Sequence, residues 1–169
     1  MVRILFVCES NRIASKMAAA YLAGKLKSLG ATDFEVQSAG LRVRKGDGMP
    51  PVAQQVITEL GYDCGWVGAK QLDLKDVRSS ELIVCLSAAV LKKVTDDFFS
   101  ARGKVIHIMT QLPERPETLR DVFEPRANLE SCRNCLAMMR PALDNMAEKM
   151  GEDGFAKFVV NTITNEIYN

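Results

Sequence analysis

Several features that mark specialised protein classes are scarce in this sequence. One histidine and an odd number of cysteines, five, occur in 169 residues. No apolar run approaches the roughly 20 residues that span a bilayer. The apolar start at residues 4–7 is too short for a signal segment, and charged residues follow it at once. We therefore expect a soluble, cytoplasmic protein with reduced thiols, without a disulfide scaffold and without a metal or other cofactor.

Charge of one sign is also lacking. The chain has 22 basic and 21 acidic residues and a net charge of +1. Such a balance produces no long-range field that would favour nucleic acid or an anionic membrane, so neither is an expected partner. Any bound anion must be held by local groups. The pattern indicates no particular oligomeric state.

The size and the order of apolar segments predict one α/β domain over residues 1–169. Apolar, β-branched runs alternate with segments that have helical spacing. Strands are predicted at 2–7, 34–38, 82–86 and 105–109, and helices at 15–29, 52–60 and 88–98. This alternation favours a three-layer sandwich with a central parallel sheet of about four strands and helices on both faces.

The last third of the chain follows a different pattern. Residues 111–128 contain three prolines and many charges, which predicts a long loop. A helix over about 129–150 should bend at Pro141. Residues 151–169 are predicted to form a C-terminal extension, separated by glycines, that covers the domain or contacts a partner. Its alternating apolar residues are Phe155, Phe158, Val160, Ile163 and Ile167.

A short loop between the first strand and the first helix carries the clearest chemical signal. The N–H groups at the start of a helix have no intrahelical partner, and the helix dipole favours an anion there. A cysteine at this turn should have a lowered pKa and act as a nucleophile towards a bound phosphate ester. The predicted phosphate-binding residues are Cys8, Glu9, Ser10, Asn11, Arg12, Ile13, Ala14 and Ser15.

These residues resemble the N-terminal signature of the low-molecular-weight protein tyrosine phosphatases: strand, Cys, two residues, Asn, two residues, Arg, Ser. Further segments match in the same order over roughly residues 2–148. They are Ser38-Ala39-Gly40, Ala69-Lys70-Gln71-Leu72, Glu81-Leu82-Ile83-Val84-Cys85-Leu86 and Val122-Phe123-Glu124-Pro125.

The resemblance implies specific roles for a few residues. Cys8 would attack phosphorus, Ser15 would donate a hydrogen bond to the thiolate, and Asn11 would hold the loop in shape. Glu124 precedes Pro125 where the family has an aspartate general acid, and a residue before proline favours an extended conformation. Asp121, three positions earlier, is the alternative acid.

Three departures from the family pattern affect this expectation. The phosphate-binding arginine falls on Ala14, and losing one such preorganised donor typically slows an enzyme about a hundredfold to a thousandfold. Aromatic residues that enclose the phosphotyrosine ring fall on Arg126 and Ala127. Arg12 either replaces the missing arginine or is solvated, and Glu9 either lines the pocket or points to solvent.

The remaining candidate residues have simpler structural interpretations. Cys132 and Cys135 have a metal-like spacing but stand without a second pair, inside a predicted helix, and we interpret them as packing residues. His107 and Cys85 lie in apolar strands and are expected to be core residues.

The sequence therefore predicts a phosphomonoester hydrolase of weak or altered activity that acts through a cysteinyl-phosphate intermediate. Its substrate would be a phosphorylated protein or a small phosphate monoester. The alternative is a non-catalytic phosphate-binding or interaction module with the same fold. A weaker alternative is a thiol redox protein similar to arsenate reductases.

Overall fold

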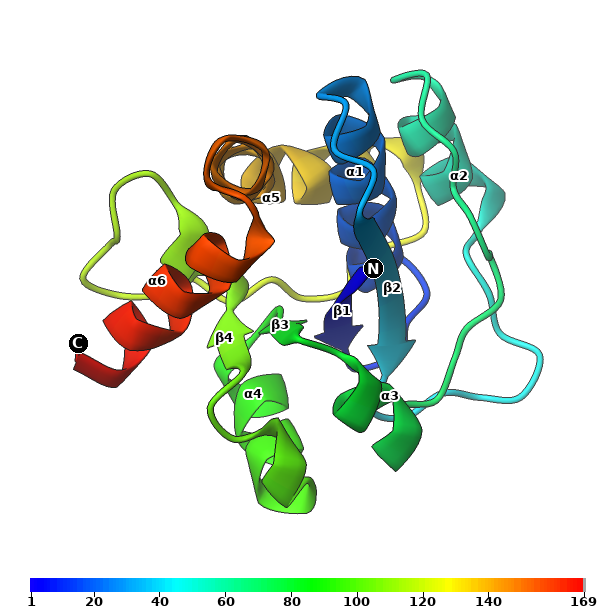
Figure 1. The fold of residues 1–169 in the computed structure, drawn as a ribbon. Coiled ribbons are helices and arrows are strands. Elements are labelled where there is room, and N and C mark those ends of the chain that lie inside the picture. The colour runs from blue at the N-terminus through cyan, green and yellow to red at the C-terminus, as the bar shows by residue number, and fades with distance from the viewer. Residues whose placement is uncertain (169) are drawn as a thin grey trace.

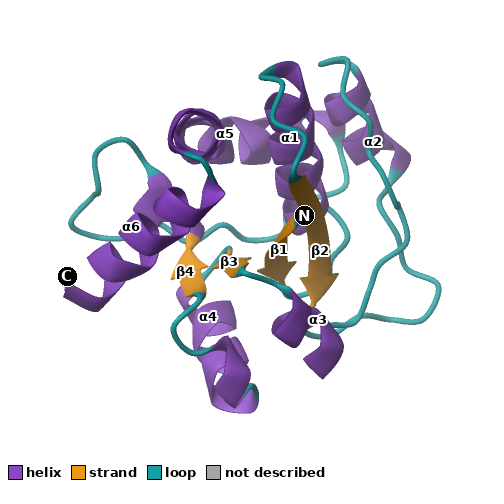
Figure 2. Cartoon of the chain, viewed as in Figure 1, coloured by secondary structure: helices purple, strands orange, loops and turns teal. Residues whose placement is uncertain are grey.

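The computed structural model describes residues 1–168 and shows alternating strands and helices (Figures 1 and 2). The strands are β1 (Val2–Cys8), β2 (Phe34–Gly40), β3 (Leu82–Cys85) and β4 (Val105–His107). The helices are α1 (Ala14–Ser28), α2 (Pro51–Thr58), α3 (Leu74–Ser79), α4 (Ala88–Asp97), α5 (Leu129–Asp153) and α6 (Phe155–Tyr168), with short 3-10 helices η1 (Phe99–Ala101) and η2 (Ile108–Gln111).

The strands form one parallel sheet in the order β2-β1-β3-β4. β1 is central, and its residue Ile4 pairs with Val36 on one side and Leu82 on the other. At the carboxyl end, Cys8 pairs with Gly40. The predicted four-stranded parallel sheet is confirmed. Ligand sites in such sheets lie beyond the carboxyl ends of the strands, which is where the loop after Cys8 begins.

Side chains that alternate along the strands enter two separate cores. Ile4 and Phe6 pack with α1, α2, α5 and α6, whereas Leu5 and Val7 pack on the opposite face with α3 and α4. Figure 1 shows α3 and α4 below the sheet, α1, α2 and α5 above it, and α6 to the left of β4. Because both faces are covered, β3 and the second half of β1 are apolar and fully buried, whereas the edge strand β2 carries Glu35 and Gln37 and is only partly buried in its first half. The predicted helices on both faces are thus confirmed.

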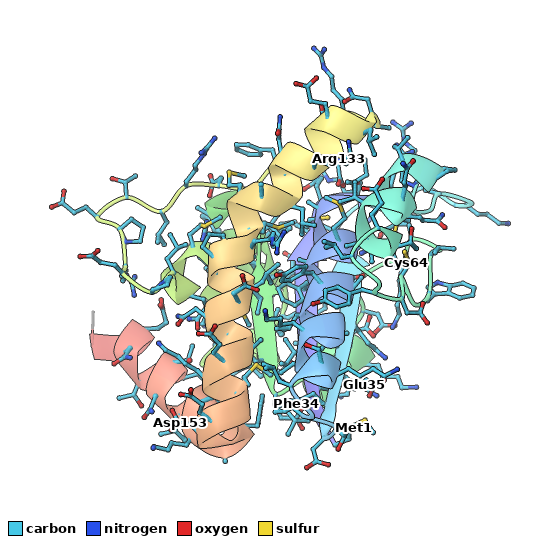
Figure 3. All side chains as sticks on the ribbon, turned by 90° about the horizontal axis from the view of Figure 1, so that it is seen from above. Met1, Phe34, Glu35, Cys64, Arg133 and Asp153 are labelled. Carbon is cyan, nitrogen blue, oxygen red and sulfur yellow. The ribbon has the colours of Figure 1, made fainter. Side chains whose placement is uncertain are left out.

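α5 is the longest helix and lies alongside α1, as seen from above in Figure 3. Pro141 lies within it, as expected, and the Tyr21 hydroxyl of α1 donates a 2.6 Å hydrogen bond to Asp144. None of the described helices is long and apolar enough to cross a lipid bilayer.

The structure corrects the prediction for the C-terminal extension. α5 continues through Gly151 to Asp153, so that Gly151 does not separate the two segments, and residues 155–168 form a helix, α6. The apolar positions also fit a helical period, and Phe158 is buried in the main core. The Ile167 side chain lies outside the described side chains, and Asn169 outside the described residues.

Two shorter elements also differ from the prediction. α3 was not predicted, because six residues carry too little periodicity. Its start is stabilised by a capping box in which Asp73 and Asp76 each accept from the other's backbone N–H. β4 ends at His107, where η2 begins, two residues before the predicted end.

Candidate active site

Cys8 lies at the end of β1, where the chain leaves the sheet and begins the phosphate loop, residues 8–15. The thiol is almost fully buried, with 4% of the residue exposed. Its Sγ accepts a hydrogen bond from the backbone N–H of Asn11 at 3.2 Å and lies 2.9 Å from Ser15 Oγ. The loop therefore curves around the sulfur atom, as expected for a nucleophile that faces a bound anion.

Asn11 fixes the shape of this loop. Its φ is +55°, the only positive value outside glycine in the described chain. The side-chain oxygen accepts from the Lys70 backbone N–H at 2.8 Å, which leaves the side-chain amide to donate to Ser15 Oγ, also at 2.8 Å. A left-handed asparagine with both polar atoms bonded is strongly held in place.

Ser15 is oriented by the same network. Because its oxygen accepts from the Asn11 amide, its own proton is free to point to the Cys8 sulfur. Gly40 supports the loop from the neighbouring strand: a Cβ on Gly40 would lie 2.9 Å from the Asn11 nitrogen. The geometry thus places Ser15 beside the sulfur and Asn11 within the loop, and their roles in catalysis stay a prediction.

Glu124 reaches from the long loop into the phosphate loop. Its Oε1 accepts from the backbone N–H groups of Ile13 at 2.9 Å and Ala14 at 2.6 Å. Its Oε2 accepts from the Ser10 hydroxyl and lies 3.7 Å from Cys8 Sγ. Ile13, the residue before α1, provides no side-chain cap, so this carboxylate satisfies the helix start. An anionic group therefore already occupies the predicted oxyanion position.

The expected lowering of the Cys8 pKa is wrong for this state of the site. Burial, and secondarily the negative charge of Glu124, raise the pKa of Cys8 from 9.0 to about 11. Hydrogen bonds from Ser15 and Asn11 act in the opposite direction but are weaker. Because burial excludes water and Glu124 repels a second anion, the thiol stays protonated at neutral pH.

The side chains of Ala14 and Arg12 differ sharply in position. Ala14 is fully buried, so only its N–H reaches the anion position. Arg12 is partly buried and lines a neighbouring cavity beside Glu9 and Ser10. Its Nε is enclosed and has no hydrogen-bond acceptor among the described residues. In this state Arg12 therefore donates nothing to the carboxylate in the phosphate loop.

Asp121 bonds to α4 and to the end of β4. It accepts from the Ala88 N–H at the start of α4 at 2.8 Å and from His107 Nε2 at 2.9 Å. The Met109 N–H donates to His107 Nδ1, so Nε2 carries the proton. These bonds, from His107 first, lower the pKa of Asp121. The buried histidine is a satisfied core residue, as expected, and Asp121 anchors the loop.

Cys132 and Cys135 pack in the core that also contains Cys8. Burial, followed by the charge of Glu124, raises the pKa of both thiols, and for Cys135 to about 12. Charge on Cys132 and Cys8 also contributes at Cys135, so these groups are neighbours. The sequence did not indicate that proximity. Among the described residues, no group of three histidines, cysteines or carboxylates is arranged to hold a metal.

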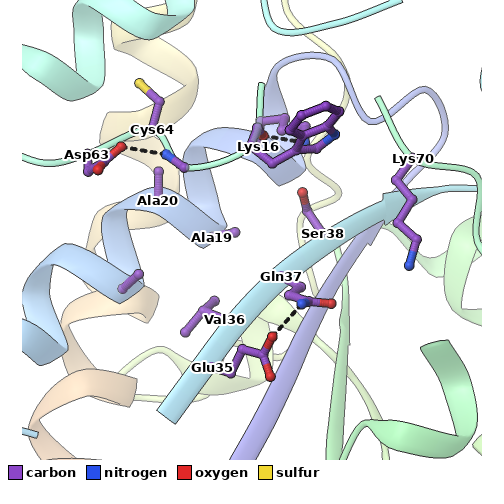
Figure 4. Close-up of a pocket in the computed structure, with 13 residues that line it drawn as sticks. Lys16, Ala19, Ala20, Glu35, Val36, Gln37, Ser38, Asp63, Cys64 and Lys70 are labelled. Atoms are coloured by element: carbon purple, nitrogen blue, oxygen red, sulfur yellow. Dashed lines mark hydrogen bonds between the residues drawn. The ribbon is translucent and has the colours of Figure 1, made fainter. Parts of the chain in front are cut away.

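A second cavity, of about 380 Å³, lies between α1, β2 and the segment around Trp66 (Figure 4). Lys16, the residue after the phosphate loop, lines it and donates to the Trp66 carbonyl at 2.8 Å. Burial lowers the pKa of Lys16 to about 8, and the charge of Cys8 partly opposes this shift. No sequence motif indicated this lysine, because its position follows the matched signature.

The parallel sheet and the cysteine-containing loop at its carboxyl edge define the class of α/β proteins with a phosphatase fold. The family model described as low molecular weight phosphotyrosine protein phosphatase matches residues 3–156, and the chain belongs to this family. No curated protein matches the chain.

Solved structures support the same fold. A mutant of YwlE from Bacillus subtilis is 20% identical, with a TM-score of 0.79, over 90% of this chain and 100% of that one. The YwlE arginine phosphatase from Geobacillus stearothermophilus is 24% identical, with a TM-score of 0.77, over 90% and 95% of the two chains. A low molecular weight protein tyrosine phosphatase from T. tengcongensis is 26% identical, with a TM-score of 0.77, over 88% and 99%.

Proposed function

We propose that this protein is a phosphomonoester hydrolase of low turnover that forms a cysteinyl-phosphate at Cys8. The observation that carries the proposal is the carboxylate of Glu124 bound to the N–H groups of Ile13 and Ala14, 3.7 Å from the Cys8 sulfur. A phosphoryl group could accept the same hydrogen bonds and would then face the thiol.

The reaction requires Glu124 to leave the loop first. The phosphoryl group of the substrate replaces the carboxylate, and the Cys8 thiol transfers its proton to the departing Glu124 carboxylate, whose Oε2 lies 3.7 Å from the sulfur. This transfer leaves a thiolate and a protonated Glu124. The sulfur then forms a bond to phosphorus while the ester oxygen departs and takes a proton from Glu124. Water cleaves the S–P bond in the second step, with Glu124 accepting its proton, so that phosphate and the free thiol are restored.

Low turnover follows from three features of the site. The position of the family arginine is taken by Ala14, which contributes no charge to the equatorial oxygens. The thiol has a raised pKa while Glu124 is bound. Substrate must also compete with an intramolecular carboxylate. Each feature raises the barrier without removing the nucleophile.

Single-turnover and steady-state assays test the proposal. We expect slow phosphate release from p-nitrophenyl phosphate and phosphotyrosine, with a phosphorylated Cys8 peptide after rapid acid quench. Phosphoarginine, which has a P–N bond in place of an ester, should be assayed beside them, because solved arginine phosphatases share the fold. Cys8→Ser is the control. Release at the same rate in Cys8→Ser and wild type would show that the proposal is wrong.

A second function is favoured by one specific observation. Ala14 and the bound Glu124 carboxylate together suit reversible anion binding better than rapid phosphoryl transfer. In that case the protein is a non-catalytic module that binds a phosphorylated partner. Calorimetry with phosphate or vanadate would then show binding without turnover, and no phosphorylated Cys8 would form.

A further inference from the structure

Three arginines from two separate segments surround a cavity next to the phosphate loop. The cavity has a volume of about 610 Å³. Arg12 contributes from the phosphate loop, and Arg42 and Arg44 contribute from the loop at residues 41–49. The acidic residues Glu9 and Asp47 also line it. The lining therefore carries a net charge of +1, which matches one carboxylate better than a doubly charged phosphoryl group.

The ion pairs of this cavity leave two arginines available. Arg42 Nε lies 3.3 Å from Glu9 Oε1, and this exposed pair is neutral overall. Within the described part of the chain, Arg44 has no side-chain hydrogen bond or ion pair. Arg12 Nε is enclosed and also lacks an acceptor there. An enclosed N–H group without an acceptor is costly, so a shift of the Arg12 side chain towards a ligand carboxylate in the cavity would be stabilising.

Ser10 lies between the cavity and the candidate active site. The Ser10 hydroxyl donates to the Glu124 carboxylate in the phosphate loop, and the same residue lines the arginine cavity. A ligand whose phosphoryl group replaces the Glu124 carboxylate can therefore place a neighbouring group in the cavity. The rim is open, since the Arg42 side chain is 81% exposed, and it can admit an extended polypeptide.

We propose that Arg12 and Arg44 bind the carboxylate of an acidic residue that flanks the phosphorylated residue of a protein substrate. This inference rests on the proposed function for the choice of ligand and adds a preference for acidic sequence. Guanidinium groups suit the task because they donate parallel hydrogen bonds to a carboxylate. Asp47 and Glu9 would disfavour a second phosphoryl group at the same position.

Binding to the full chain with Cys8→Ser tests the inference without turnover. Two phosphotyrosine peptides are compared, identical except for glutamate or glutamine on both sides of the phosphotyrosine. We expect the glutamate peptide to bind about tenfold more tightly, as for a charge-assisted contact of moderate exposure. Adding Arg44→Gln should remove this difference. Lys45→Gln, a charge removal in the same loop outside the cavity lining, should retain it.

The outcomes separate this inference from the proposed function. Equal binding of the two peptides would overturn the arginine site. Equal losses of affinity for the glutamate peptide in Arg44→Gln and Lys45→Gln would also overturn it, because they would indicate long-range charge alone. A tenfold preference in Cys8→Ser would support it even if the protein with Cys8 released no phosphate, in which case only the catalytic proposal fails. Turnover without a peptide preference would overturn the inference and leave the proposed function standing.

Discussion

The backbone N–H of Ala14 donates a 2.6 Å hydrogen bond to Oε1 of Glu124, a residue 110 positions later in the chain. This contact joins the start of α1 to the proline-rich loop and fills the position where an oxyanion would bind. One carboxylate therefore has two consequences. It stabilises the start of the helix, and it keeps the phosphate loop closed to other anions.

Removal of this carboxylate should open the loop. We expect Glu124→Ala to lose about 1 kcal/mol of folding stability, as for other lost helix caps. Phosphate or vanadate should then bind to the variant more tightly than to wild type and restore the lost folding stability. Thermal denaturation with and without phosphate measures both effects. Glu117→Ala, an exposed change in the same loop, is the control.

The same variant should make Cys8 more reactive. Because the charge of Glu124 raises the Cys8 pKa, its removal should shift the pH profile of alkylation by iodoacetamide downward. Burial remains the larger cause, so the pKa should stay above that of an exposed thiol. An unchanged profile in Glu124→Ala would show that the carboxylate does not influence the sulfur.

A positive charge at position 14 should increase the rate. If the absent guanidinium is the main defect, Ala14→Arg should raise kcat by about a hundredfold or more. The site is fully buried, so a loss of stability is also expected. Ala14→Met introduces similar length without charge and is the matched control. Equal kcat values in both variants would assign the proposed low turnover to Glu124 or to loop geometry.

Alkaline pH should destabilise the protein partly through Cys8. Its pKa is 9.0 when exposed and about 11 in the folded state, so between these values the unfolded chain releases a proton that the native state retains. The contribution to stability is therefore complete below pH 9 and is lost as pH rises towards 11, by about 2 to 3 kcal/mol. Urea denaturation between pH 9 and 11 should show a smaller decline in the free energy of unfolding for Cys8→Ser than for wild type.

Gly40 should be required for the loop. A Cβ there would lie 2.9 Å from the backbone nitrogen of Asn11, so Gly40→Ala must displace the phosphate loop. We expect Gly40→Ala to lose about 1 to 3 kcal/mol of folding stability and to bind phosphate more weakly. In contrast, Gly151→Ala in α5 meets only Leu29 at 4.0 Å and should be stabilising, because alanine is the better helix former. Differential scanning calorimetry of Gly40→Ala, Gly151→Ala and wild type measures both changes in stability.

Much of the fold could be predicted because its signals are local. The apolar run before Cys8 and the helical spacing after Ser15 defined the central strand, the loop and the first helix. α6 was missed because its apolar positions suited more than one period, and only burial of Phe158 against the domain decides between them.

The site was predicted less completely. Cys8, Asn11 and Ser15 are close in sequence, and the family signature fixed their arrangement. The position of Glu124 was predicted, but its insertion into the loop depends on a contact between distant segments. The raised Cys8 pKa depends on burial and on that same contact. Arg42 and Arg44 could be noticed only as basic residues in a loop, because their approach to Arg12 is a tertiary feature.

Glu124 and Asp121 are the two candidates for the general acid. Glu124 is beside the sulfur, whereas Asp121 is bonded to His107 and Ala88, which hold its pKa low and keep it ionised. A general acid must obtain a proton before it donates one, and Glu124 Oε2 lies 3.7 Å from the Cys8 thiol that can supply it, so we expect Glu124 to serve. Glu124→Gln should therefore lower kcat about a hundredfold for phosphotyrosine, whose leaving group needs protonation, and much less for p-nitrophenyl phosphate.

Asp121→Asn is the matched control for this assignment. Asparagine keeps an acceptor oxygen for His107 and Ala88, so the loop should remain anchored and the ratio of the two substrate rates should stay that of wild type. The decisive measurement is kcat for both substrates in both variants. A selective loss on phosphotyrosine in Asp121→Asn, with Glu124→Gln as active as wild type, would transfer the role to Asp121. That result would also require the loop to release His107 during turnover, because the carboxylate cannot otherwise leave its present partners.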